Sequence, residues 1–78
     1  MKYESEIREI IRMAQEKGVE QQFCVIDKSL FCGGIKLSLP DGKVSVICNE
    51  MVENGLAKIL RNSNSAIYYE LTVRAEDF

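Results

Sequence analysis

The sequence contains no histidine and no tryptophan, only one proline and only three cysteines. Histidine is the usual general base near neutral pH, so its absence excludes Ser-His-Asp and Cys-His catalysis and His-containing zinc sites. Cys24, Cys32 and Cys48 form no Cys-x-x-Cys pair, so their spacing does not fit a structural zinc site. We therefore expect no metal, no cofactor and no enzymatic activity.

The sequence also lacks a long apolar run. The N-terminal stretch MKYESEIREIIRM interleaves charged and apolar residues, unlike a secretory signal, and no stretch reaches the roughly 18 apolar residues of a membrane span. An odd number of scattered cysteines argues against the disulfide framework of a small secreted domain. We expect a cytoplasmic protein with reduced thiols that does not enter a membrane.

What remains is typical of one folded domain that spans residues 1–78. Hydrophobic residues make up 46% of the chain and charged residues 28%, with both signs mixed. The formal net charge is −2, from ten Lys and Arg against twelve Asp and Glu. Because no segment concentrates the basic residues, binding that neutralises many phosphates is not favoured.

The first segment predicts an amphipathic helix. Its apolar residues recur at helical spacing on one face: Tyr3, Ile7, Ile10, Ile11 and Ala14. Charged residues occupy the other face. Ser5 is a candidate N-cap, and we expect Gly18 to end the helix.

Three strands are predicted next. Gln21 to Asp27 is rich in residues that favour strands, and Leu30 to Leu39 alternates apolar and polar residues in its second half. The sequence Leu39-Pro40-Asp41-Gly42 has proline and glycine at the positions that a four-residue turn favours. Lys43 to Cys48 is then expected to return as the third strand, paired with the second.

The stretch FCGGIKL, Phe31 to Leu37, interrupts the second predicted strand. Two adjacent glycines inside a strand usually mark a bulge, a bend or the close approach of another backbone. The alternative is an anion-binding glycine loop, but such loops lead from a strand into a helix, whereas this one continues into a strand. We therefore interpret Gly33 and Gly34 as a bend.

A second helix and a last strand complete the prediction. Asn49 is a natural N-cap, and an apolar stripe continues from it toward Arg61. Gly55 inside this helix either permits close packing or shortens the helix. Ala66 to Arg74 alternates cleanly between apolar and polar residues, which makes it the clearest strand of the chain.

These elements predict an α+β fold of order α-β-β-β-α-β. We expect a two-layer sandwich in which two helices cover one face of a four-stranded mixed sheet of order 3-2-1-4, with the last strand parallel to the third. The α-β-β-β-α part resembles double-stranded-RNA-binding domains. However, the helix that begins with the acidic NEMVEN lacks the lysines of that family, so we do not assign the chain to it.

The predicted sheet leaves one face free of helices. On it we place a candidate partner-binding site of six residues: Ile26, Lys36, Ile47, Tyr68, Thr72 and Arg74. Apolar residues ringed by polar ones are typical of protein-binding surfaces, although scattered apolar residues are also common on any surface.

The main hypothesis is therefore a small non-enzymatic module that binds another protein, or a second copy of itself as a homodimer, through the open sheet face or an edge strand. Such stoichiometric binding is how small regulators and inhibitors work, including those that phages and mobile elements encode.

Two alternatives stay open. The first is a nucleic-acid-binding module that uses a local basic patch of Lys36, Lys43 and Arg74. The second is a small enzyme subunit with a reactive thiol at Cys48, because this residue precedes a predicted helix N-terminus, where the pKa of a thiol is lowered. The alternation of the predicted third strand points Cys48 into the core instead, where a cysteine is inert.

Overall fold

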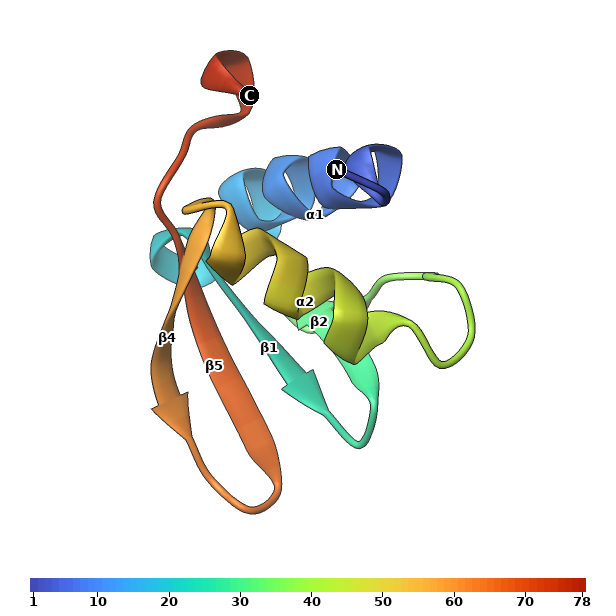
Figure 1. Cartoon of the computed structure of the whole chain (residues 1–78). Coiled ribbons are helices and arrows are strands. Elements are labelled where there is room, and N and C mark those ends of the chain that lie inside the picture. Colours follow the sequence, from blue (N-terminus) through green and yellow to red (C-terminus); the bar gives the residue numbers. More distant parts are fainter.

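In the computed structural model, which describes residues 1–78, two α-helices pack on a five-stranded antiparallel sheet (Figure 1). The helices are α1 (Glu4–Lys17) and α2 (Val44–Glu53). The strands are β1 (Gln22–Ile26), β2 (Ser29–Cys32), β3 (Ile35–Lys36), β4 (Ala57–Asn62) and β5 (Ala66–Leu71). Short 3-10 helices occupy Val19–Gln21 and Ala75–Asp77. Neither α1 nor α2 is long and apolar enough to cross a membrane.

The strand order is β3-β2-β1-β5-β4, and every neighbouring pair is antiparallel. The last strand lies beside the first, as the sequence predicts. The sheet has five strands instead of four, however, and the predicted mixed sheet with a parallel crossover is wrong. Because β4 and β5 form a hairpin, β5 enters the sheet antiparallel to β1, and no crossover connection is needed.

The two glycines of FCGGIKL form a hairpin turn. Gly33 and Gly34 have φ of 57° and 82°, and they join Cys32 of β2 to its partner Ile35 of β3. A two-residue hairpin turn of this hand needs a positive φ at both central residues, which glycine adopts without a steric penalty. The predicted strand Leu30 to Leu39 is therefore two short strands and a loop.

The predicted third strand, Lys43 to Cys48, is the beginning of α2. The β-branched residues and the alternating Val-Ser-Val favour a strand, but helix propensities differ by only about 0.7 kcal/mol per ordinary residue. Ile47, Cys48 and Met51 fall at helical spacing, and α2 buries all three against the sheet and α1. Burial of this face outweighs the local preference for a strand.

Gly55 shortens α2, which is the second of the two roles considered for it. Its φ is 70°, and the backbone N–H of Leu56 donates to Met51 O at 2.9 Å while that of Gly55 donates to Val52 O at 3.1 Å. These two bonds are those of a Schellman motif, in which a left-handed residue ends a helix. The chain released by this turn becomes β4, so the helix does not reach Arg61.

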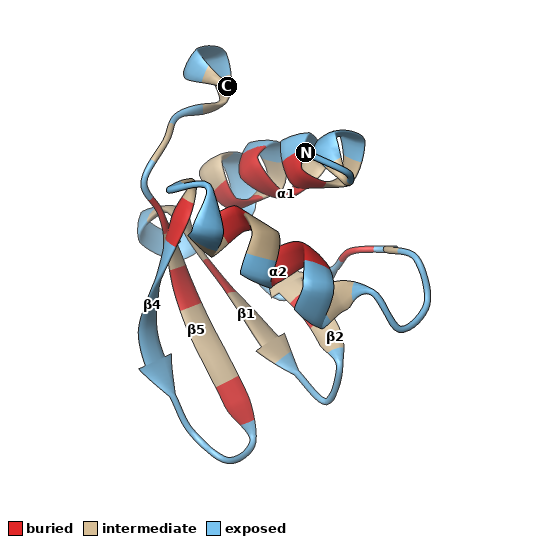
Figure 2. Cartoon of the chain, in the orientation of Figure 1, coloured by how far each residue is buried: buried red, intermediate tan, exposed pale blue.

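Both helices cover the same face of the sheet, as predicted (Figure 2). Ile7, Ile10 and Ile11 of α1 are fully buried in one cluster with the core-facing residues of β1, β2, β5 and α2. At its centre the rings of Phe23 and Tyr69 stack with centroids 4.9 Å apart and an interplanar angle of 8°. The opposite face of the sheet carries no helix.

Candidate functional site: the outer face of the sheet

The helix-free face carries a row of side chains that crosses all five strands. Lys36 of β3 lies opposite Phe31 of β2, and Phe31 lies opposite Cys24 of β1. Cys24 lies opposite Tyr68 of β5, and Tyr68 lies opposite Arg61 of β4. Directly opposite residues of an antiparallel pair project from the same face, so these five side chains form one line. We call them the aromatic row.

The two ends of the aromatic row are positively charged. The guanidinium carbon of Arg61 lies 4.4 Å from the centroid of the Tyr68 ring, which is within the range of a cation–π interaction. Neither Arg61 nor Lys36 takes part in an ion pair of the chain. Lys58, on the same face of β4, pairs with Glu70 at 3.3 Å. The row therefore presents two aromatic rings between two free cations.

A hollow of about 230 Å³ opens onto the aromatic row. Its lining consists of Val19, Gln22, Phe23, Cys24, Phe31, Gly33, Gly34 and Tyr68. Cys24 is the smallest side chain of the row and stands between Phe31 and Tyr68. Strands lie about 4.8 Å apart, so the two aromatic residues stand roughly 10 Å apart with the thiol between them.

Three of the six predicted partner-binding residues lie on this face or at its end. Tyr68 and Lys36 belong to the aromatic row. Ile26 ends β1, is 39% exposed and lies opposite Ser29 and Ala66.

Of the other three, Ile47 and Arg74 do not lie on the sheet face, and Thr72 lies just past the end of β5. Ile47 lies in α2 and is fully buried, because the segment predicted as a strand is a helix. Thr72 follows β5, and its Oγ1 donates to the carbonyl oxygen of Gly55 at 2.5 Å. Arg74 lies beyond the sheet and pairs with Glu76 at 3.2 Å. Thr72 is thus bonded to the turn that ends α2, and the pair of Arg74 with Glu76 is exposed to solvent.

The sequence pattern does not identify two residues of the aromatic row. The pattern places Phe31 at the edge of a bend. In the structure Phe31 belongs to the short strand β2, where it shares the outer face with Ser29. The pattern also places Arg61 at the end of a helix. The signal that could have found Arg61 is Gly55, because a helix that ends there frees the following residues to form an edge strand.

The thiol predicted as reactive is buried. Cys48 is the fifth residue of α2 rather than a residue before its N-terminus, and it is 1% exposed. Burial raises the pKa of the Cys48 thiol to about 11, although a hydrogen bond with Tyr69 acts in the opposite direction. Cys48 therefore does not lie at a helix N-terminus, which is the position that would lower the pKa of its thiol.

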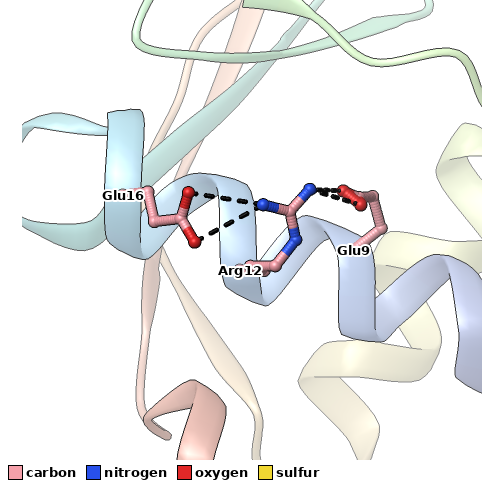
Figure 3. Close-up of polar contacts among 3 residues, drawn as sticks. All are labelled: Glu9, Arg12 and Glu16. Carbon is pink, nitrogen blue, oxygen red and sulfur yellow. Dashed lines mark hydrogen bonds and ion pairs between the residues drawn. The ribbon is translucent and has the colours of Figure 1, made fainter.

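Other polar groups have structural partners. Glu50 accepts a hydrogen bond from the backbone N–H of Tyr3 at 3.2 Å, so it holds the start of α1 against α2. On the solvent face of α1, Arg12 binds Glu9 and Glu16 (Figure 3), and the hydrogen bond with Glu9 raises the pKa of Arg12.

The structure brings together no group of three or more His, Cys, Asp or Glu side chains that could hold a metal ion.

The basic patch suggested for nucleic acid is not assembled as predicted. Lys36 lies on β3, Lys43 directly precedes α2, and Arg74 follows β5 with Glu76 as its partner. The largest hollow of the molecule, about 620 Å³, lies between the turns that join β1 to β2 and β4 to β5. Asp27 and Lys28 are the only charged residues in its lining, so it has no set of convergent catalytic groups.

Comparison of the chain with models of protein families, with curated proteins and with solved structures found no match.

Proposed function

We propose that this chain is a small non-enzymatic module that binds another protein through the aromatic row. The observation that carries the proposal is the line of Phe31, Tyr68 and Arg61 on a sheet face that no helix covers. Aromatic residues and arginine are enriched at the centres of protein interfaces, where a few of them supply most of the binding energy. The polar residues beside the row, such as Gln22 and Glu70, match the rim of such an interface.

The charge of the face favours a protein over a nucleic acid as the partner. Only Lys36 and Arg61 are free of carboxylate partners in the row, so contact with a phosphate backbone would neutralise about two phosphates and gain little from counterion release. The net charge of −2 also gives no long-range attraction for a polyanion. In addition, the guanidinium of Arg61 already lies over the ring of Tyr68, where a base would stack.

A module of this kind acts by occupying a surface of its partner. No nucleophile and base lie together on the outer face, and its one cysteine, Cys24, is a thiol whose pKa is raised by burial. The proposed action is therefore stoichiometric, as for a regulator or for an inhibitor carried by a phage or a mobile element.

Affinity capture with matched variants tests the proposal. The chain is immobilised as wild type, as Tyr68→Glu, as Phe31→Ser and as Val46→Ser, and proteins retained from a nuclease-treated lysate of the source cells are quantified by mass spectrometry. Val46→Ser is the control, because Val46 is 47% exposed but lies on α2, away from the outer face. We expect the same proteins on wild type and Val46→Ser, and their loss from Tyr68→Glu and Phe31→Ser.

Light scattering after size-exclusion chromatography tests for a second copy as the partner. A wild-type dimer that dissociates on Tyr68→Glu would make the partner another copy of this chain. Capture that is equal on all four forms would show that the aromatic row is not the binding surface. Capture that occurs from an untreated lysate but not from the nuclease-treated one would show that nucleic acid, not protein, is held.

A further inference from the structure

We infer that the partner inserts one aliphatic or aromatic side chain into the hollow above Cys24, and that acidic residues on both sides of this anchor bind Arg61 and Lys36. The inference rests on the proposed function, because it names the chemistry of the protein segment that the aromatic row would hold. The partner segment is thus acidic at its two ends and apolar at its centre.

The hollow is suited to one apolar group. Phe31 and Tyr68 form two of its walls and Cys24 lies between them, in a volume of about 230 Å³. Burial raises the pKa of the Cys24 thiol, so the thiol is uncharged at neutral pH and behaves as a small apolar surface. Most of its lining residues are apolar, so an apolar side chain that covers them removes apolar surface from water. Interface anchors typically fill pockets of this kind.

The ends of the aromatic row are suited to carboxylates. Arg8, Arg12 and Arg74 all pair with carboxylates of this chain, whereas Arg61 and Lys36 have none. A guanidinium binds a carboxylate with two parallel hydrogen bonds, and stacking on Tyr68 holds Arg61 in place before it binds. The cations are therefore available to an acidic partner.

The spacing of the strands sets the spacing of the partner's residues. Lys36 and Arg61 are four strand separations apart, roughly 19 Å, and Cys24 lies midway between them. An extended segment rises about 3.4 Å per residue. The acidic residues should therefore lie about three positions before and about three positions after the apolar anchor.

Selection from a displayed library of random dodecapeptides tests this inference and requires no identified partner. The baits are the wild-type chain, Tyr68→Glu and Phe31→Ser, together with Cys24→Ile, which narrows the hollow, and Cys24→Ser, which keeps its size. A further pair compares Lys36→Glu/Arg61→Glu with Lys43→Glu. Lys43→Glu is the control for a single charge reversal away from the row, because Lys43 directly precedes α2. Circular dichroism verifies that every bait is folded.

We expect the wild type, Cys24→Ser and Lys43→Glu to enrich peptides with one apolar residue and Asp or Glu about three positions on each side. Affinity for a synthetic copy of an enriched peptide should fall about tenfold or more on Cys24→Ile. The double charge reversal should select basic residues at the flanking positions instead. Methylthiolation of Cys24 in the folded wild type, reversed by dithiothreitol, repeats the hollow-filling test if Cys24→Ile does not fold.

The outcomes separate this inference from the proposed function. Peptides that depend on Tyr68 and Phe31 but show no acidic bias, or that bind Cys24→Ile equally well, would overturn the inference and leave the proposed function standing. If no peptide is enriched in a way that depends on the aromatic row, both the inference and the proposed function are overturned. A fluorescein-labelled dT20 oligonucleotide is titrated in parallel, and row-dependent binding of this probe without peptide enrichment would also overturn both.

Discussion

Gly33 lies so close to the C-terminal end of α1 that a Cβ atom placed on it would be 1.9 Å from the carbonyl oxygen of Lys17. No side chain fits in this position without movement of the backbone. The neighbouring Gly34 also has a positive φ, but a Cβ atom placed on it would meet nothing within 4 Å. The turn between β2 and β3 thus requires glycine for two different reasons at two consecutive positions.

Gly33→Ala should therefore cost much more stability than Gly34→Ala. Both substitutions place a side chain in the left-handed region, at about 1–2 kcal/mol. Gly33→Ala adds a clash with the end of α1, and overpacking typically costs a further 1–3 kcal/mol. Urea unfolding followed by circular dichroism measures both free energies of unfolding. Equal losses would mean that α1 does not rest on this turn in solution.

A thiol-specific reagent should modify one cysteine per folded chain. Cys24 is partly exposed on the outer face, whereas Cys32 and Cys48 are buried. We expect Ellman's reagent to release one equivalent from the native wild type and three after unfolding in guanidinium. The variant Cys24→Ser is the control. It should release no equivalent when native and two equivalents after unfolding. Rapid native release from Cys24→Ser would contradict the burial of the other two thiols.

Stability should decrease above pH 9. Burial raises the pKa of Cys32 from 9.0 to about 12, that of Cys48 from 9.0 to about 11 and that of Tyr69 from 10.0 to about 12. Between about pH 9 and 11 the unfolded chain releases these protons while the folded chain keeps them. The free energy of unfolding therefore falls as pH rises, by up to about 1.4 kcal/mol per pH unit for each group.

Unfolding in urea under reducing conditions at several pH values from 8 to 11 measures this slope. Cys32→Ala removes one of the three groups. The free energy of unfolding of this variant should therefore fall less steeply with pH than that of the wild type, even if the two differ at pH 8. Identical slopes for wild type and Cys32→Ala would show that Cys32 titrates normally in the folded protein.

Gly55→Ala should destabilise the chain by about 1 kcal/mol, because φ at this position is 70° and a side chain there is strained. Gly55→Asn is the matched comparison and should cost less, since asparagine tolerates the left-handed conformation better than alanine does. Thermal unfolding of the two variants measures the difference. If alanine is tolerated as well as glycine, α2 does not end in the left-handed turn.

The sequence predicts α1 and β5 well because their periodicity is long and unambiguous, and because Gly18 follows α1 directly. It does not predict where α2 lies. The residues from Val44 to Cys48 prefer strands individually, and only their burial against α1 and the sheet decides in favour of a helix. β4 is missed for the same reason, since its apolar residues continue the helical spacing past Gly55.

The candidate site is predictable only in part. Alternation along the strands places Tyr68 and Lys36 on the outer face, and this alternation does not depend on the rest of the fold. Phe31 and Arg61 join them only because a two-residue turn at Gly33 and an early helix end at Gly55 set the register of neighbouring strands. Such turns depend on backbone conformation, which the composition of a segment does not determine.

The pairing of β1 with β5 has a consequence for how the chain folds. These two central strands come from opposite ends of the chain, while β1 with β2 and β4 with β5 are local hairpins. Each hairpin follows its own helix, so the molecule consists of two successive helix-hairpin halves joined along one seam. Formation of that seam requires closure of a long loop, so we expect it to be the slow step of folding. The aromatic row crosses this seam between Cys24 and Tyr68, so it exists only once the two halves have joined.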